Sequence, residues 1–256
     1  MTLIQTLNPS DGGGDKAVDI NGKALGTLGH GSARLSIAQR DGRSFLDQRY
    51  FTDPYRIFTP RTTPGEPASI VLSTLSGGLV GGDRLSFEGQ VKPGASAQFV
   101  GQSAEKIYKS AGPTTQVEFS LRAEKDAWLE QVPQETILFD QSRLERRFNI
   151  NIASGGQALV GDMVVLGRLA MGEQFAQGLF SDTWRLAVDD KLVWCDRMGF
   201  EGAGIEAAKA NPFGLAGAKA FATILYVGEA AEQAVEMARD PLWTERAQTL
   251  GLRLGA

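Results

Sequence analysis

The chain has 256 residues, of which 42% are hydrophobic and 22% charged, and its formal net charge is -4 at pH 7. These values are typical of a soluble globular protein, and no stretch approaches the roughly 18 unbroken apolar residues of a membrane-spanning helix. The sequence also has no basic block that would follow a phosphate backbone. We therefore expect neither a membrane nor a nucleic acid as a partner.

Histidine and cysteine each occur once, as His30 and Cys195. One imidazole and one thiolate cannot build a tight transition-metal site within a single chain, and a Ser-His-Asp or Cys-His catalytic engine would depend wholly on His30. A single cysteine forms no internal disulfide, and the N-terminus lacks the basic start and apolar centre of a secretory signal. We expect a cytoplasmic protein without a tight metal site or a tightly bound cofactor.

Short strands and tight turns are predicted through most of the chain. Residues 1–22 are rich in Asn, Asp, Ser and Gly, which indicates a flexible lead-in. Asp41-Gly42-Arg43 is typical of a hairpin turn, and a strand is predicted at 69–75 after the proline-containing loop 59–67. The glycine-rich segment 77–83 lacks the Lys-Ser/Thr ending of a phosphate-binding loop and leads into alternating residues, so we expect its glycines to permit positive φ angles and close backbone contact rather than to bind phosphate.

Further turns are predicted at 92–95, 125–126 and 155–156, each between segments in which apolar and polar residues alternate. The strongest hairpin signal is Asp189-Asp190-Lys191, which separates two alternating runs. The segment 162–173 is consistent with either a buried strand or a short helix. Its Arg168 either pairs with a neighbouring acid or lies exposed at a strand end, and exposure is the commoner fate of a charged residue.

The pattern changes beyond Gly204. We expect a helical turn at 205–210, a last strand at 220–227 and a helix at 229–239, which Asp240-Pro241 ends before a shorter helix. The predicted organisation is a lead-in, one β-rich domain and a C-terminal helical segment, at residues 1–22, 23–228 and 229–256. The fold class is mainly β with a few short helices, and twelve or more short strands suit a sandwich, a barrel or a solenoid.

One stretch, Val132–Asp140, breaks the alternation on either side of it. Gln134, Glu135 and Thr136 lie between Pro133 and an apolar run. Because a buried carboxylate is costly unless it is paired or hydrogen-bonded, this mixture indicates a shared buried polar site. The alternative is an ordinary strand followed by a turn.

Four motifs together resemble the motif series of the urease accessory protein D family, called H in some bacteria. They occur in the family order, and the resemblance runs from about Gly26 to Phe200. The motifs are Gly77–Asp83, Gln102 with Lys106-Ile107-Tyr108, Pro133–Asp140 and Gly167–Glu173. Family members usually continue through a longer C-terminal segment, so the resemblance also predicts a shortened tail.

The resemblance implies a superhelical β-structure and a non-enzymatic scaffold that binds apo-urease. With accessory proteins F and G, such a scaffold passes nickel to the urease active site, so that nickel is in transit and not a resident cofactor. The family is also thought to contain a water-filled internal passage for the ion. A solenoid suits such a passage, because successive strands can each direct one polar residue toward a common axis.

Oxygen ligands hold a divalent ion less tightly than imidazole or thiolate, which suits transit. The candidates for an ion passage are five acids, of which the third motif supplies two: Asp83, Glu135, Asp140, Asp162 and Glu173. The side chains expected to support them are Lys106, Tyr108, Gln134, Thr136 and Arg168. We hypothesise in particular that Glu135, Asp140 and Glu173 line the passage.

Two alternatives stay open at the level of the sequence. A β-solenoid or barrel enzyme could act on a polysaccharide with Glu135 and Asp140 as acid and base, and it would show paired acids beside an exposed aromatic platform. An interaction module without any ion path would instead use the same motifs only for folding and docking.

Overall fold

The computed structural model describes residues 29–239, which form mainly β-strands. The strands of this part of the chain are β1 His30–Arg40, β2 Arg43–Phe51, β3 Tyr55–Phe58, β4 Ala68–Thr74, β5 Arg84–Val91, β6 Ser96–Gly101, β7 Glu105–Ile107, β8 Thr115–Ala123, β9 Trp128–Gln131, β10 Thr136–Leu138, β11 Arg143–Ile152, β12 Gln157–Leu166, β13 Leu179–Val188, β14 Lys191–Glu201 and β15 Ala220–Val227. The helices are α1 Gly204–Ala210, α2 Ala231–Arg239 and the 3-10 turn η1 Leu169–Met171.

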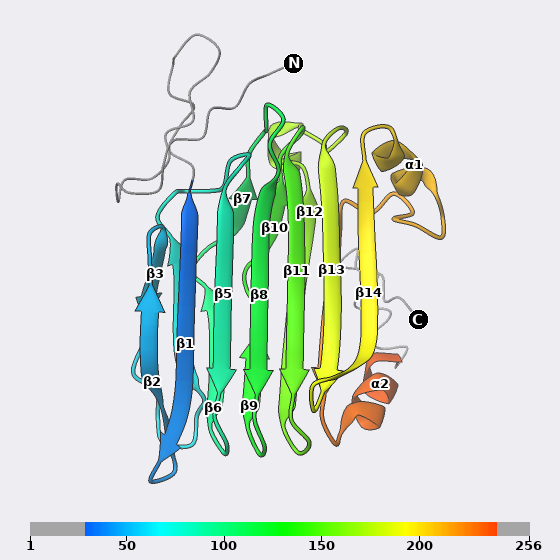
Figure 1. Cartoon of the computed structure of the whole chain (residues 1–256). Coiled ribbons are helices and arrows are strands. Elements are labelled where there is room, and N and C mark those ends of the chain that lie inside the picture. Colours follow the sequence, from blue (N-terminus) through cyan, green and yellow to red (C-terminus); the bar gives the residue numbers. More distant parts are fainter. Residues whose placement is uncertain (1–28, 240–256) are drawn as a thin grey trace.

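The strands build two sheets, one behind the other in Figure 1. The seven-stranded sheet has the order β14-β13-β11-β8-β5-β1-β2, and its five inner strands run parallel to one another. The eight-stranded sheet has the path β3-β4-β6-β9-β12-β10-β7, with β15 paired to β12. Antiparallel strands close the seven-stranded sheet at both edges, namely β2 and β14.

Between β5 and β13 the chain winds as a β-solenoid. It passes from β5 to β6 and β7, then through β8, β9 and β10, and then through β11 and β12 to β13. Each coil adds one strand to the seven-stranded sheet. To the other sheet it adds either two short strands that follow one another, as in β6 with β7 and β9 with β10, or one long strand, as in β12. The predicted mainly β, solenoid-like fold is therefore confirmed.

The predicted turns lie where consecutive coils stack. The backbone N–H of Gly94 donates to the carbonyl of Lys125 at 3.1 Å, and that of Asp126 donates to Gly155 at 3.2 Å. Stacked turns satisfy backbone groups that would otherwise be left without partners at the ends of the strands. The predicted β13–β14 hairpin turns through Asp189 and Asp190, which both have positive φ angles of 47° and 63°.

A ladder of aromatic rings fills the core beneath the seven-stranded sheet. Phe87, Phe119, Phe148 and Trp184 occupy matching positions on β5, β8, β11 and β13. Phe119 and Phe148 stack with centroids 4.7 Å apart, and Phe148 and Trp184 stack at 4.0 Å. Parallel in-register pairing thus places one large ring on each coil at the same height.

The glycine-rich segment 77–83 has positive φ angles at Gly77, Gly78 and Gly82 and makes close backbone contact, as predicted. Gly78 has φ +142°, and a Cβ at this position would lie 2.8 Å from the carbonyl oxygen of Lys106. Only glycine allows the two backbone segments to approach this closely. The segment thereby packs the loop before β5 against β7.

The segment 162–173, for which a strand and a short helix were both open, contains the second half of strand β12 and then the 3-10 turn η1. The helices predicted at 205–210 and 229–239 correspond to α1 and α2, and the predicted strand at 220–227 is β15. The expected lead-in at 1–22 and the shorter helix after Asp240-Pro241 lie outside the described residues. Within residues 29–239, no helix is long and apolar enough to cross a membrane.

Candidate functional site

A buried ionic cluster lies between the two sheets and is centred on Arg146 of β11. Its guanidinium donates to Asp182 of β13 through Nε at 3.1 Å and Nη2 at 2.8 Å, and its Nη1 donates to Thr136 of β10 at 3.0 Å. The Arg146 side chain is 3% exposed. Trp184 Nε1 also donates to Asp182 at 3.0 Å.

Asp162 of β12 completes the cluster from the opposite sheet. Its Oδ2 lies 2.8 Å from Arg146 Nη2, which is an ion pair, although no hydrogen bond of good geometry reaches this oxygen. The side chains of Arg146 and Asp162 are 3% and 4% exposed. A buried carboxylate oxygen without a hydrogen bond is uncommon and marks a position where a further donor, a water molecule or a cation can bind.

The charges of the cluster do not balance, because one guanidinium faces two carboxylates. Burial raises the pKa of Asp162 to about 6, since the attraction of Arg146 offsets only part of the desolvation and Asp182 adds repulsion. Burial lowers the pKa of Arg146, but the two carboxylates outweigh it and hold the pKa above its ordinary value. Asp162 therefore exchanges its proton near neutral pH while Arg146 stays charged.

A cavity of about 100 Å³ adjoins this cluster. Its lining includes Thr136, Arg146 and Asp162, together with Gln131, whose buried Oε1 has no hydrogen-bond partner. The space has room for several water molecules, and its polar groups suit water. The lining of this cavity is mostly apolar, and these few polar groups share it with Phe119 of the aromatic ladder.

The cavity reaches the surface through an interruption in the eight-stranded sheet. The line of β6 and β7 is broken at 102–104, and the line of β9 and β10 is broken at 132–135. Exposed Ser103 and Gln134 line the same cavity as buried Asp162. Exposed residues of the outer face of this sheet and the buried ionic cluster therefore line one cavity.

Glu105 of β7 lies on the wall of the cavity, beside the interruption. Burial raises the pKa of Glu105, although Thr74 Oγ1 donates to its carboxylate at 3.0 Å and partly opposes that effect. Burial, and then the charge of Glu105, raises the pKa of Tyr55, which also lines the cavity. The cavity therefore has two acids of raised pKa, Glu105 and Asp162.

Three of the ten candidate residues from the sequence line this cavity: Asp162, Gln134 and Thr136. Within 132–140, Thr136 is buried and hydrogen-bonded to Arg146, and the shared buried site expected for this stretch stays a prediction. Glu135 is half-buried next to the interruption, where its backbone carbonyl accepts the N–H of Glu105 at 2.9 Å. Lys106 is exposed on β7.

Asp140 and Glu173 belong to a separate network at the end of the solenoid. Asp140 Oδ1 accepts the backbone N–H groups of Ala176 and Gln177, both at 2.9 Å. Glu173 accepts the N–H of Asp140 at 3.1 Å and forms an ion pair with Arg168. These acids brace the loop that follows η1.

Two aromatic residues, Phe139 and Tyr108, also belong to that network. The guanidinium of Arg168 lies 4.2 Å from the centroid of the Phe139 ring, which meets Tyr108 edge to face at 4.9 Å. Arg168 is both exposed and paired, so each of the two expectations for it holds in part. Asp83 lies outside both this network and the cavity lining. Its carboxylate accepts the N–H groups of Gly29 and Val80 and fixes the turn before β5.

The sequence analysis did not select Arg146, Asp182 or Glu105 as site residues. The sequence did carry a signal for two of them. Alternate residues of a strand face the core, and Arg146 occupies such an inward-facing position between Leu144 and Phe148. Asp182 likewise stands at an inward position of β13. Among the described residues, no group of three His, Cys, Asp or Glu side chains is arranged to hold a metal ion.

The fold and the cavity define a β-solenoid with a buried ionic cluster on the wall of an interior cavity. The family model for the UreD urease accessory protein matches residues 29–256. The chain is 44% identical over 209 residues to the urease accessory protein UreD of Magnetococcus marinus, with 82% of this chain and 72% of the relative covered. The corresponding protein of Brucella suis is 37% identical over 210 residues, with 82% and 75% covered.

The UreD of Mesorhizobium japonicum is 36% identical over 210 residues, with 82% of this chain and 74% of the relative covered. The chain therefore belongs to the UreD urease accessory protein family, and its role lies in urease maturation. The family that the four motifs predicted is confirmed.

Proposed function

We propose that this protein binds apo-urease in the cytoplasm and, together with accessory proteins F and G, passes nickel to the urease active site. Membership of the UreD family supports the general role, because the relatives are named urease accessory proteins. The observation that supports the nickel step is the single cavity lined both by exposed Gln134 and by the buried, unbalanced cluster around Asp162.

The donor atoms along this cavity suit an ion that must leave again. Gln134, Gln131, Glu105 and Asp162 offer oxygen atoms, while the single histidine and the single cysteine lie outside the cavity lining. Oxygen ligands bind Ni²⁺ more weakly than imidazole or thiolate. Nickel is the cargo of this cavity and not a resident cofactor.

Arg146 further limits how tightly a cation is held. Its guanidinium already engages Asp162 and Asp182, so an entering Ni²⁺ competes with a fixed positive charge. The second carboxylate leaves the cluster with an excess of negative charge that still attracts the ion. The balance of these two effects favours brief occupancy over storage.

The candidates Glu135, Asp140 and Glu173 lie outside the lining of this cavity, and their role in an ion passage stays a prediction. Substituting each by Ala tests it, because undiminished urease activation in cells would end that hypothesis. We expect loss of loop order for Asp140→Ala, since two backbone N–H groups lose their acceptor.

The acid and base roles considered for Asp140 and Glu135 in a polysaccharide-cleaving enzyme receive no support from the geometry. Partial burial raises the pKa of Asp140, but the N–H groups of Gln177 and Ala176 outweigh it and hold the pKa below its ordinary value. Such a carboxylate is a poor proton donor. We therefore propose a non-catalytic role for this chain.

Co-expression tests the proposal directly. Apo-urease and accessory proteins F and G are produced with and without this chain, the tagged chain is recovered, and nickel-dependent urease activity is measured. We expect a complex that contains apo-urease, and activation that requires this chain. Equal activation without the chain would overturn the proposal.

A further inference from the structure

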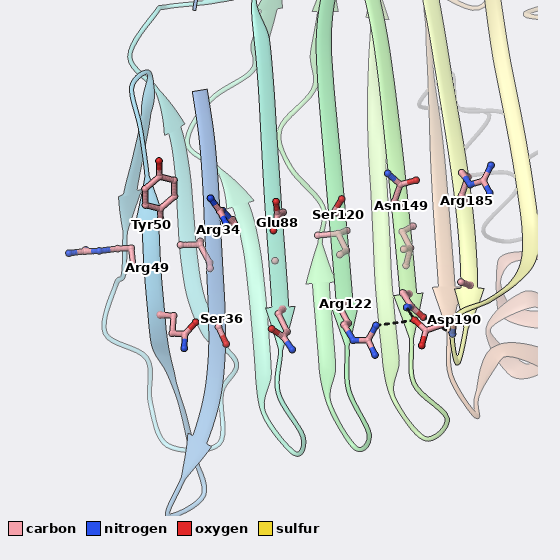
Figure 2. Close-up of a pocket in the computed structure, with 18 of the residues that line it drawn as sticks. Arg34, Ser36, Arg49, Tyr50, Glu88, Ser120, Arg122, Asn149, Arg185 and Asp190 are labelled. Carbon is pink, nitrogen blue, oxygen red and sulfur yellow. Dashed lines mark hydrogen bonds and ion pairs between the residues drawn. The ribbon is translucent and has the colours of Figure 1, made fainter. Parts of the chain in front are cut away.

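The outer face of the seven-stranded sheet carries a broad hollow of about 910 Å³, which is separate from the interior cavity. Figure 2 shows its residues on neighbouring strands, with Arg34 and Tyr50 on one side and Arg185 on the other. Parallel register places Arg34, Glu88, Ser120, Asn149 and Arg185 in one row across β1, β5, β8, β11 and β13. Long side chains at the ends of this row and short ones in its middle make the surface concave.

The hollow is positively charged on a chain whose net charge is -4. The charged side chains that line it are three arginines, Arg34, Arg122 and Arg185, and two acids, Glu88 and Asp190, which leaves a net charge of +1, whereas the side chain of Arg49 points away from the hollow (Figure 2). Arg122 is already paired with Asp190 at 3.1 Å and with Glu124 at 3.5 Å. Hydrogen bonds from Asn151 and Arg122 hold the pKa of Asp190 below its ordinary value, so this acid stays ionised.

The other two arginines of the hollow, Arg34 and Arg185, are free to bind an anion. Within residues 29–239, no carboxylate lies at ion-pairing distance from Arg34 or Arg185. The guanidinium of Arg34 rests 5.0 Å from the centroid of the Tyr50 ring, which is 49% exposed. This stacking orients the guanidinium before any partner arrives, and arginine and tyrosine are the residue types that most often anchor protein interfaces.

We propose that this hollow docks an acidic, extended segment of a protein partner in the urease maturation assembly. The inference rests on the proposed function, because the assembly supplies the partner. Arg34 and Arg185 are four strand spacings apart, or roughly 19 Å at about 4.8 Å per spacing. An extended peptide of about six residues covers that length, so two carboxylates near its ends reach the two guanidinium groups.

The middle of the row distinguishes a peptide from a nucleic acid. Glu88 lies next to Arg34 in the row, and Ser120 and Asn149 follow it. A phosphate backbone carries a negative charge at every nucleotide and would place one against Glu88. An acidic peptide can instead present an amide or hydroxyl group there, between its two carboxylates.

Charge reversal tests the docking surface within the assembly. The double variant Arg34→Glu with Arg185→Glu is compared with Arg43→Glu with Arg61→Glu, which makes the same change of charge at exposed residues outside the hollow. All four side chains are exposed, and thermal unfolding checks that both variants remain folded. The readout is the amount of apo-urease and accessory proteins F and G recovered with the tagged chain at rising NaCl concentration.

We expect at least a tenfold loss of one partner for Arg34→Glu with Arg185→Glu and less than a twofold change for the control. Equal recovery with both variants, or equal loss from both, would overturn the docking surface while leaving the scaffold role intact. If the wild-type chain itself recovers no partner, the proposed function fails, and the docking inference fails with it.

A crosslinking experiment identifies the chemistry of the segment. Arg185→Lys places a primary amine in the hollow, and a carbodiimide joins an amine to a carboxylate that contacts it. We expect a crosslinked partner peptide that contains Asp or Glu, and none from the control Arg43→Lys. Recovery of co-purified nucleic acid without any such peptide would overturn the assignment to an acidic protein segment.

Discussion

Arg146 and Asp162 come from opposite sheets of the solenoid and meet in its interior, where Nη2 of Arg146 lies 2.8 Å from Oδ2 of Asp162. This contact and the bonds of Arg146 to Asp182 and Thr136 join β10, β11, β12 and β13 at one point. A buried ion cluster of this kind costs desolvation free energy, so its presence is better explained by a role than by stability alone.

Removing Arg146 alone should destabilise the protein strongly. Arg146→Met leaves Asp162 and Asp182 buried without a cation, and we expect the free energy of unfolding to fall by about 3 to 5 kcal/mol. Urea denaturation followed by circular dichroism measures the change.

The triple variant Arg146→Met, Asp162→Leu, Asp182→Leu provides the matched comparison. Because replacing a whole buried ion cluster with apolar residues is commonly neutral or stabilising, we expect it to recover most of the lost stability. A triple variant as unstable as Arg146→Met would show that the charges are not the reason for the loss.

The raised pKa of Asp162 should make stability depend on pH. The folded state shifts this pKa from 3.8 to about 6, so the folded protein binds the proton more tightly than the unfolded chain. The wild-type free energy of unfolding, taken relative to that of Asp162→Asn, should therefore fall by about 2 kcal/mol as pH rises from about 4 to about 6. Denaturation of both proteins across this range measures the difference, and parallel curves would contradict the assignment.

The aromatic ladder should contribute a large share of the core. Phe148 is fully buried and stacks on both Phe119 and Trp184, so Phe148→Ala should lower the free energy of unfolding by about 3 to 5 kcal/mol. Phe213 is 98% exposed, and Phe213→Ala should change it by less than about 0.5 kcal/mol. Comparable losses of unfolding free energy in the two variants would contradict a large contribution of the aromatic ladder to stability.

The outer face of the eight-stranded sheet carries an apolar row that should promote self-association. Phe58 pairs with Val71, and Val71 pairs with Val100 in the next strand. Ile224 and Val132 flank Gly161 farther along the sheet, where Ile224 is 69% exposed. Because exposed apolar patches associate in water, Phe58→Ser with Ile224→Ser should reduce the aggregation of the isolated chain. Light scattering against concentration measures it, and unchanged scattering would exclude this row as the cause.

Much of the fold was predictable because its signals are local. Alternation of apolar and polar residues locates the strands, and Asp41-Gly42, 92–95 and Asp189-Asp190 carry turn chemistry that needs no distant partner. The choice of a solenoid over a sandwich or barrel depends on which strands pair across coils, and local patterns leave that choice open.

The site was predictable only in part, because its members come from separate coils. Asp162 and Thr136 were selected, but Arg146 and Asp182 were missed although both interrupt apolar, inward-facing positions. Asp140 lies in the same motif as Thr136, yet the chain leaves the strand after Leu138, so Asp140 faces a loop. Proximity in the sequence therefore did not translate into a shared cavity.

The most direct test of the central claim blocks the interior cavity at its exposed side. Gln134 is exposed and lines the cavity, whereas Gln39 on β1 is exposed and lies outside both the lining and the interruption, so Gln134→Trp and Gln39→Trp form a matched pair. Each variant is co-expressed with apo-urease and accessory proteins F and G, and both complex recovery and nickel-dependent urease activity are measured. We predict that both variants retain the complex and that only Gln134→Trp loses most of the activation. Full activation by a Gln134→Trp complex would contradict the passage of nickel through this cavity.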